Sequence, residues 1–288
     1  MSRIKHHTPY YDSEGKGEFD LSYHLEMISD LERVRLFKEG IDKLVDSDSI
    51  FCELGCGTGI FSIYAAIKAK KVYAIEIDEN VFAVAKRNVE RCGLADKIVL
   101  ICGDVFKTVL PEKVDVVFCE MLSTWLIEEP QVLAINHAKK NFLKSEGIII
   151  PEKIINLVEL CNMDYKFGDI EFKTPFVQFT GIKHPRIMTE SKTVDVVNFI
   201  RHNKLKVNKS TELETLTSGL INSARLSSIV KISEGVNFYS TDTLMPLTIV
   251  PLKNELNVKE RQKVIFNSNY KYRSNLIDAD FQVMIKSK

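Results

Sequence analysis

The chain has 288 residues, which is enough for two modest domains and a sizeable hydrophobic core. Its basic and acidic residues both number 39, so no global positive field draws it to nucleic acid or to an anionic membrane. No apolar run is long enough to span a bilayer and no signal peptide opens the chain, so we expect a cytoplasmic protein without a membrane partner.

The six cysteines form no C-x-x-C pair and lie mostly in apolar, strand-like runs. This usage is typical of small buried side chains in a reducing compartment. We therefore expect neither disulfides nor a metal site from the cysteines, which are Cys52, Cys56, Cys92, Cys102, Cys119 and Cys161.

Residues 1–36 are predicted to form a lid of cover helices. The first 20 residues are rich in charge and glycine but contain Tyr10, Tyr11 and Phe19, which suggests a segment that folds over something. From residue 21 apolar side chains recur every three or four positions, as in a helix. The capping-box signature Ser29-Asp30-Leu31-Glu32 predicts that a second helix begins there, with a bend near Met27.

Residues 37–150 alternate between apolar strand-like runs and amphipathic helical runs. Strands buried on both faces and separated by helices predict a doubly wound parallel sheet, hence an α/β fold. The predicted strands are 50–54, 72–77, 98–102, 114–119 and 148–150, and the predicted helices are 60–69, 80–92 and 131–142.

A glycine turn follows the first of these strands. Gly55, Gly57 and Gly59 are spaced G-x-G-x-G, whereas a dinucleotide site has G-x-G-x-x-G, and Glu53 stands two residues ahead. The next strand ends at Glu76, whose carboxylate can accept hydrogen bonds from both hydroxyls of a ribose. The alternative is an ordinary glycine-rich turn with a surface glutamate. The pattern resembles the first motif of the class I S-adenosylmethionine (SAM)-dependent methyltransferases, which have a Rossmann-like fold.

Ligands on such sheets lie beyond the carboxyl ends of the strands. Those ends carry Gly55, Glu76, Asp104 and Glu120, so we expect all four to face one cleft. Asp104 is a candidate for the adenine end of the cofactor, and a plain turn aspartate is the equal alternative.

After Pro151 the helical periodicity fades. Runs at 154–160, 226–232, 247–250, 262–267 and 280–285 are rich in β-branched and aromatic residues, with Gly, Asn and Ser between them. We therefore predict a second, mostly antiparallel, barrel-like β domain over 151–288, with the boundary at 147–151. Residues 168–208 fit a loop, a lid or an oligomerisation arm.

The segment from Cys119 to Glu129 resembles the protein arginine methyltransferases. In that family two glutamates nine positions apart hold the substrate guanidinium, and Glu120 and Glu129 have this spacing, with Glu128 as a neighbouring competitor. Residues 24–33 resemble the family's cover helices. This resemblance implies that Met27 faces the reacting sulfur and that Arg33 binds the cofactor carboxylate.

Two sets of site residues follow. The predicted cofactor contacts are Met27, Arg33, Glu53, Gly55, Gly57, Gly59, Glu76, Ile77, Asp104, Val105 and Glu120, and the predicted catalytic residues are Glu120, Glu129, Asp30 and His24. His24 is placed to bond a loop glutamate or Asp30, although a lone histidine in a cover helix is more often structural. SAM is the expected cofactor and S-adenosylhomocysteine the expected product.

Three features differ from the family pattern. Met121-Leu122-Ser123 stands where Trp-Met-Gly is usual, and Asp242-Thr243-Leu244 lacks the histidine and tryptophan of the family's barrel loop. The stretch 163–194 is short for a dimerisation arm.

The resemblance implies methyl transfer to arginine in a protein or peptide. Two carboxylates suit that substrate, because they orient the planar guanidinium and stabilise its charge. The alternatives are a methyltransferase acting on a small molecule or RNA, and a SAM-binding scaffold that has lost turnover. RNA is disfavoured, because no Asn/Asp-Pro-Pro-Tyr follows the fourth strand. A homodimer remains open.

Overall fold

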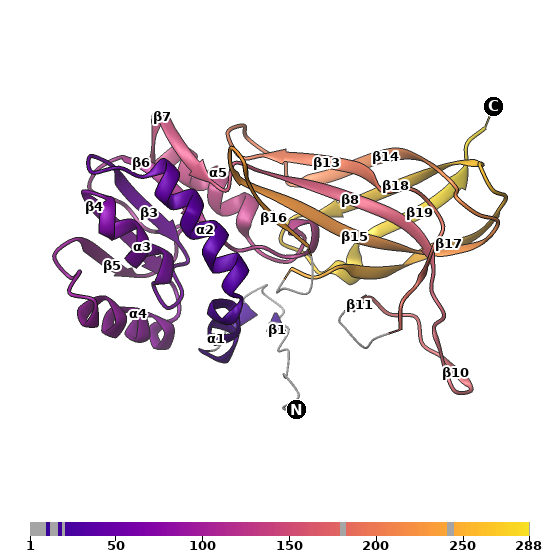
Figure 1. Ribbon diagram of the computed structural model, residues 1–288, viewed down its shortest axis with the longest axis horizontal. Coiled ribbons are helices and arrows are strands. Elements are labelled where there is room, and N and C mark those ends of the chain that lie inside the picture. Colours follow the sequence, from indigo (N-terminus) through magenta and orange to yellow (C-terminus); the bar gives the residue numbers. More distant parts are fainter. Residues whose placement is uncertain (1–9, 12–16, 19–20, 179–182, 241–244, 288) are drawn as a thin grey trace.

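The computed structural model describes residues 10–11, 17–18, 21–178, 183–240 and 245–287. Much of the predicted lid, including Phe19, and the segment Asp242-Thr243-Leu244 lie outside the described residues. Near the N-terminus, β1 (Tyr10–Tyr11) and β2 (Gly17–Glu18) pair in antiparallel fashion. Figure 1 shows two bodies side by side, a helix-covered sheet and a body of long strands.

The first body is a five-stranded parallel sheet in the order β5-β4-β3-β6-β7. Successive strands run outward from β3 in one direction and then from β6 in the other, so the switch point lies between these two neighbours. The predicted doubly wound α/β sheet is confirmed. Its strands are β3 (Ile50–Leu54), β4 (Lys71–Glu76), β5 (Ile98–Cys102), β6 (Val114–Cys119) and β7 (Leu143–Ile150), and its helices are α3 (Ile60–Lys68), α4 (Glu79–Arg91) and α5 (Gln131–Asn141).

The two expected helices precede this sheet as α1 (Leu21–Ser29) and α2 (Leu31–Leu44). The second helix begins within the predicted capping-box segment, and the break falls at Asp30, three residues after the predicted bend at Met27. Asp30 is the N-cap of α2, and its carboxylate accepts a hydrogen bond from the backbone N–H of Arg33 at 3.1 Å. The hydroxyl of Ser29 instead donates to the carbonyl of Leu25 at 2.7 Å, so Ser29 ends α1 and does not cap α2.

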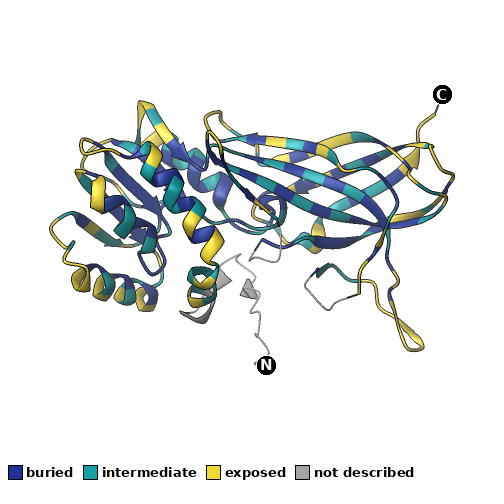
Figure 2. Cartoon of the chain, viewed as in Figure 1, coloured by how far each residue is buried: buried dark blue, intermediate teal, exposed yellow. Residues whose placement is uncertain are grey.

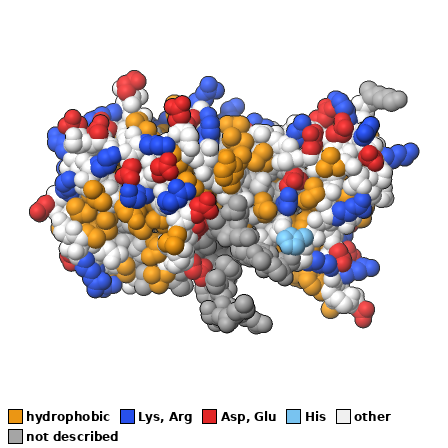
Figure 3. Space-filling model, in the orientation of Figure 1, with side chains coloured by type: hydrophobic (Ala, Val, Ile, Leu, Met, Phe, Trp, Pro, Cys, Tyr) orange, Lys and Arg blue, Asp and Glu red, His pale blue; other side chains and the backbone are white. Residues whose placement is uncertain are grey.

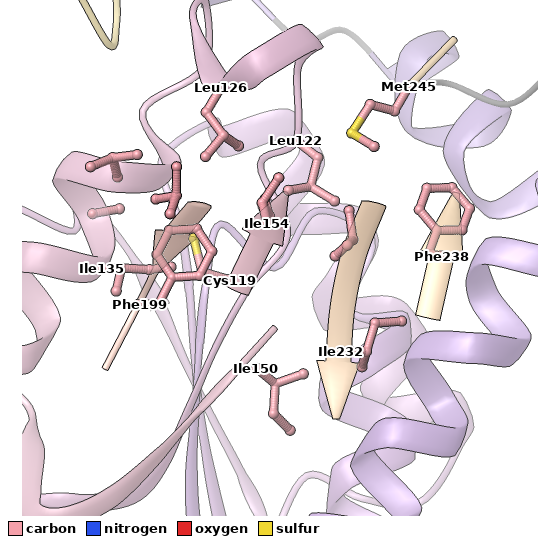
Figure 4. Packing of buried hydrophobic residues seen from close by; sticks show 14 of the residues in the cluster. Cys119, Leu122, Leu126, Ile135, Ile150, Ile154, Phe199, Ile232, Phe238 and Met245 are labelled. Atoms are coloured by element: carbon pink, nitrogen blue, oxygen red, sulfur yellow. The ribbon is translucent and has the colours of Figure 1, made fainter. Parts of the chain in front are cut away.

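Helix α2 packs against both bodies. The ring of Phe37 lies 5.5 Å from that of Phe118 in the parallel sheet and 6.3 Å from that of Phe238 in the other body. A Cβ atom on Gly40 would lie only 2.3 Å from a methyl carbon of Ile232. Figure 4 shows Ile232 and Phe238 in the layer between strands and helix. The hydrophobic core is therefore continuous from one body to the other.

The second body contains two antiparallel sheets. The larger is built on β8 (Lys153–Asn162), β15 (Gly219–Ser233) and β17 (Thr248–Val258), with β11 (Phe176–Val177), β12 (Arg186–Ile187), β13 (Lys192–Asn198) and β16 (Val236–Tyr239) at its edges. The smaller contains β14 (Lys206–Glu214), β18 (Lys263–Lys271) and β19 (Asp280–Ile285). A hairpin of β9 (Lys166–Phe167) and β10 (Ile170–Glu171) projects from this body.

The two sheets close on each other along both sides, since β13 lies against β14 and β17 against β19. Along β8 and β15 buried residues alternate with half-buried ones, as the colours of Figure 2 show, so one face of each strand is turned to the core. The predicted antiparallel, barrel-like architecture is confirmed. The stretch 168–208, where no strand was predicted, in fact contains β10, β11, β12, β13 and the start of β14.

Two of the six cysteines depart from the expected burial. Cys92 and Cys102 are exposed, because one ends α4 and the other ends the edge strand β5, while Cys52, Cys56, Cys119 and Cys161 are buried. Among the described helices, none has the length and apolar character that a membrane span requires.

Candidate functional site

A pocket of about 440 Å³ lies at the carboxyl ends of β3, β4 and β6, at the switch point of the sheet. This volume is in the range of small-molecule sites. Its wall includes twelve of the predicted site residues, which are His24, Met27, Arg33, Glu53, Gly55, Gly57, Glu76, Ile77, Asp104, Val105, Glu120 and Glu129.

Two predicted site residues are not part of this wall. Asp30 is turned to the backbone of α2, which it caps. Gly59 is the N-cap of α3 with φ of +86°, and a Cβ atom there would meet Ala85 of α4 at 3.5 Å. Gly59 therefore lets two helices approach each other and does not face the pocket.

The other two glycines form the floor of the pocket. Gly55 has φ of +69° and Gly57 has φ of +54°, a region that side chains with a Cβ atom rarely adopt. A Cβ atom on Gly55 would lie 2.5 Å from the methyl carbon of Met121, and one on Gly57 would lie 2.8 Å from Nδ1 of His24. Residues from the cover helix and from the loop after β6 thus lie directly over the glycine turn.

Glu76 is fixed against this turn. One carboxylate oxygen accepts a hydrogen bond from the N–H of Gly57 at 2.8 Å, and the other accepts from the N–H of Asp78 at 2.9 Å. Each oxygen keeps a second lone pair for a ligand. Asp104 is fixed in a similar way, since its side chain accepts from the N–H of Phe106 at 2.9 Å.

Glu53 is buried below the turn, where the hydroxyl of Ser62 donates to its carboxylate. Burial raises the pKa of Glu53 to about 8, a value in which the hydrogen bond from Ser62 opposes the rise and the carboxylates of Glu120 and Glu76 add to it. Ser62 was not among the predicted site residues, because nothing in a helical run shows that its hydroxyl faces the preceding strand.

Glu120 forms an ion pair with Arg33, which arrives from α2, 87 positions earlier in the chain. Their side chains are 5% and 1% exposed. Burial raises the pKa of Glu120, and the positive charge of Arg33 opposes that rise. The guanidinium also lies 5.9 Å from the centre of the Phe238 ring. Arg33 therefore connects helix α2, the pocket and the β body.

The loop after β6, residues 120–130, is anchored in the β body by its tryptophan. Trp125 lies in the short helix η1 (Thr124–Leu126) and is fully buried. Its indole N–H donates to the carbonyls of Leu157 at 3.2 Å and Ser227 at 3.0 Å. Trp125 and Leu126 have φ of 53° and 60°, a conformation that costs free energy in residues other than glycine and is maintained here by burial.

Two further side chains hold the loop, and neither was among the predicted residues. The amide of Gln131 accepts from the N–H of Met121 and donates to the carbonyl of Cys119, both at 2.7 Å. The hydroxyl of Ser123 accepts from the N–H groups of Glu128 and Glu129, both at 3.1 Å. Serine at the position of the family's glycine thus has a structural role.

Glu128 and Glu129 both line the pocket. Burial raises the pKa of Glu128, while a hydrogen bond from the backbone of Leu276 in the β body opposes this. Glu129 is 6% exposed. Three glutamates of one loop therefore face the same pocket as the glycine turn, an arrangement suited to a cationic ligand.

The chain is similar to several known proteins. Residues 35–171 match the family model of the ribosomal protein L11 methyltransferase (PrmA). The uncharacterized protein MJ1452 of Methanocaldococcus jannaschii is 32% identical over 257 residues, which cover 88% of this chain and 93% of that protein.

Protein arginine N-methyltransferase 2 of Mus musculus is 36% identical over 146 residues, which cover 49% of this chain. The match spans 32% of the length of that relative. Among solved structures, the Trypanosoma brucei PRMT1 enzyme–prozyme complex with AdoHcy has a TM-score of 0.76 at 20% identity, and the alignment covers 92% of this chain and 93% of that one.

Proposed function

This chain belongs to the family of the M. jannaschii protein MJ1452 and is a divergent, arginine-methyltransferase-like class I SAM-dependent methyltransferase, and from that premise we propose that it methylates a guanidinium nitrogen of arginine in a protein. The observation that carries the proposal is the presence of Glu120, Glu128 and Glu129 on one loop facing the glycine-turn pocket.

The residues of the pocket fit SAM. Gly55 and Gly57 line the pocket without side chains of their own, and Glu76 retains lone pairs for the ribose hydroxyls. We assign Ile77, Asp104 and Val105 to the adenine end, and Met27, Arg33 and Glu53 to the methionine end. When bound, SAM supplies a methyl group on a positively charged sulfur.

The chain's own groups would then orient the acceptor. Glu120 and Glu129 hold the guanidinium plane by paired hydrogen bonds and keep one nitrogen aimed at the methyl group. The same carboxylates stabilise the positive charge, and Glu120 accepts the proton that the nitrogen loses. A buried carboxyl with a raised pKa is suited to that acceptance.

The two remaining catalytic candidates act indirectly in this proposal. Asp30 is a positioning residue, because its cap fixes the backbone of Arg33. His24 lies over Gly57 and closes the pocket from above. For a homodimer, which the sequence leaves open, the exposed Phe167, Ile170 and Phe172 of the β9–β10 hairpin offer an apolar surface, which sedimentation velocity can test.

The decisive experiment replaces the loop glutamates one at a time. Glu120→Gln keeps the shape and the hydrogen-bonding capacity but removes the charge that opposes the guanidinium. Turnover should fall by about 10²–10³, the usual effect of losing one preorganised partner of the transition state. Glu129→Gln should behave alike and Glu128→Gln should be mild. Methyl transfer from radiolabelled SAM into a peptide measures these rates.

The matched control is a peptide with lysine in place of arginine. Lysine carries the same charge but lacks the planar fork, so a two-carboxylate clamp should discriminate strongly between the peptides. Equal methylation of both peptides, or full activity in Glu120→Gln, contradicts the arginine assignment and leaves a SAM-dependent methyltransferase with another substrate.

A further inference from the structure

A band of basic side chains begins at the rim of the pocket. Its members come from α5, from the loop before β14 and from the adjoining strand ends, and are Lys140, Arg201, Lys204, Lys206, Lys271 and Arg273. All six are exposed. Arg273 is the member that lines the pocket, and its guanidinium lies 5.8 Å from the centre of the Phe106 ring.

The register of the small sheet continues the band. Lys206 on β14 lies directly opposite Lys271 on β18, and the neighbouring residues Val207 and Tyr270 are buried. Since side chains alternate along a strand, both lysines point outward on the same face. The N–H of Tyr272 donates to the carbonyl of Leu205 at 3.0 Å, which places Lys204 beside the same strand end.

Helix α5 joins the band through its contacts with the loop 199–205. The amide of Asn136 donates to the carbonyl of Asn203 at 2.8 Å and accepts from its N–H at 3.1 Å. Lys140 lies one helical turn beyond Asn136, and Arg201 belongs to the contacted loop. The six cations therefore form one surface that runs from the pocket rim across the junction of the two bodies.

This surface is not neutralised within the described residues. None of its six members has an ion-pair partner there, and two of the nearby acids are already paired, Asp195 with Lys209 at 2.9 Å and Asp104 with Lys107 at 3.9 Å. Like charges directly opposite across two strands are destabilising, so Lys206 and Lys271 weaken the sheet that carries them. On the face drawn in Figure 3, basic and acidic side chains are interspersed.

The pocket and the band thus have opposite charge. From this juxtaposition we infer that the basic band docks an acidic segment of the substrate protein, close in its sequence to the arginine that enters the pocket. The inference rests on the proposed function, and it names a class of substrate in which a cationic side chain adjoins several carboxylates. One chain that carries both charges engages both surfaces at high effective concentration.

A protein segment fits this surface better than single-stranded nucleic acid does. Proteins that bind single strands place aromatic side chains for the bases to stack on. The exposed phenylalanine and tyrosine side chains of the described residues are Phe167, Phe172 and Tyr239, none of which belongs to the elements of the band, where His202 is the exposed ring. For bases to stack on, the band therefore offers a single exposed imidazole and no exposed phenylalanine or tyrosine among the described residues.

The test measures binding to the protein saturated with S-adenosylhomocysteine. A fluorescent peptide with a central arginine flanked by glutamates is compared with its glutamine-flanked twin by anisotropy. The glutamate peptide should bind about 10-fold more tightly at low salt, and this advantage should shrink at high salt. The triple variant Lys204→Glu, Lys206→Glu, Lys271→Glu should abolish the advantage.

The control variant has the same change of charge elsewhere. Lys86, Arg87 and Arg91 on α4 are also exposed and free of ion pairs among the described residues, so their replacement by Glu should leave the advantage intact. Equal binding of the two peptides to the wild-type protein overturns the inference. So does an RNA oligomer that binds the band more tightly than the glutamate peptide.

A third peptide separates this inference from the proposed function. It keeps the glutamates and carries lysine in place of the central arginine. If its affinity still depends on the band while its methylation equals that of the arginine peptide, the docking surface is supported and the arginine assignment is wrong. If the band variant binds all three peptides as the wild type does, the docking surface is wrong whatever the acceptor.

Discussion

The pocket has two walls that are built in different ways. The glycine-turn wall is local, since Glu76 reaches back only 19 positions to bond Gly57. The acidic-loop wall is held from a distance, because Trp125 bonds carbonyls 32 and 102 positions away in the β body. The first wall is complete once neighbouring strands of the parallel sheet pair, whereas the second also requires the β body. Cofactor binding and substrate orientation should therefore fail separately.

Substitutions in the glycine-turn wall should have the largest effect on cofactor affinity. Glu76→Ala removes a charged acceptor, which costs about 1.5–3 kcal/mol, or about 10- to 150-fold in affinity. Gly57→Arg should be at least as severe, because backbone with φ of +54° must approach the ligand. Calorimetry with S-adenosylhomocysteine measures both.

The control for this prediction is Glu79→Ala, an exposed acid in the first turn of α4. It should leave cofactor affinity unchanged within error. Unaltered affinity in both pocket variants would mean that the glycine turn does not bind the cofactor. The two walls would then not divide cofactor binding and substrate orientation between them.

Weakening the anchor of the acidic-loop wall should lower turnover and leave cofactor affinity unchanged. Trp125→Phe keeps an aromatic ring but removes the indole N–H that donates to Leu157 and Ser227. Losing buried hydrogen bonds costs about 1–3 kcal/mol of stability, and we expect turnover to fall about 10-fold as the loop shifts. Urea unfolding gives the first quantity and methyl transfer the second.

The affinity for S-adenosylhomocysteine decides what that variant means. It should stay near the wild-type value, because the rings packed against the indole, Phe266, Tyr270 and Phe281, belong to the β body. A cofactor affinity that drops in step with turnover would show that the two walls are one cooperative unit.

The smallest expected effect is on the pH dependence of stability, and it concerns Glu53, which is buried beneath the glycine-turn wall. Its carboxyl has a pKa of about 8 in the folded chain, against 4.5 as its ordinary value, so folding retains a proton that the unfolded chain loses. Stability contributed by the neutral form is complete below pH 4.5 and is lost as the pH rises through about 8. Glu53→Gln removes this dependence.

The melting temperature of the ligand-free protein tests that sign. Glu53→Gln should match the wild type near pH 4.5 and exceed it by about 2–8 °C above pH 8, the shift that about 1–2 kcal/mol produces in a chain of this size. Glu79→Gln, which alters an exposed acid, should show no such divergence. A wild type that gains on Glu53→Gln as the pH rises would mean that Glu53 is ionised in the folded chain.

The sequence pattern predicts the parallel sheet better than the β body, for a physical reason. Strands such as Ile50–Leu54 are buried on both faces, so their apolar runs stand out, and the predicted bounds of that strand are confirmed. Strand Lys206–Glu214 faces water on one side and contributes few apolar residues, among them Val207 and Leu213. Such a strand resembles a polar loop until its partner is known.

The same distinction applies to the site. The positions of Gly55, Gly57 and Glu76 in the pocket follow from a short motif, because adjacent parallel strands bring their ends together. The pairing of Arg33 with Glu120 and the burial of Trp125 depend on contacts between distant segments. No periodicity or spacing within either segment encodes those partners, so sequence analysis found neither.

The packing of Gly40 and Phe37 determines how the chain can be divided. Helix α2 is made among the first 44 residues, but part of its apolar surface is covered by Ile232 and Phe238, nearly 200 positions later. Contacts of such high sequence separation close late in folding, because a long loop must be ordered first. A fragment that stops at the end of the parallel sheet would leave this face of the helix in water. The two bodies that look separable in outline share one helix and form a single folding unit.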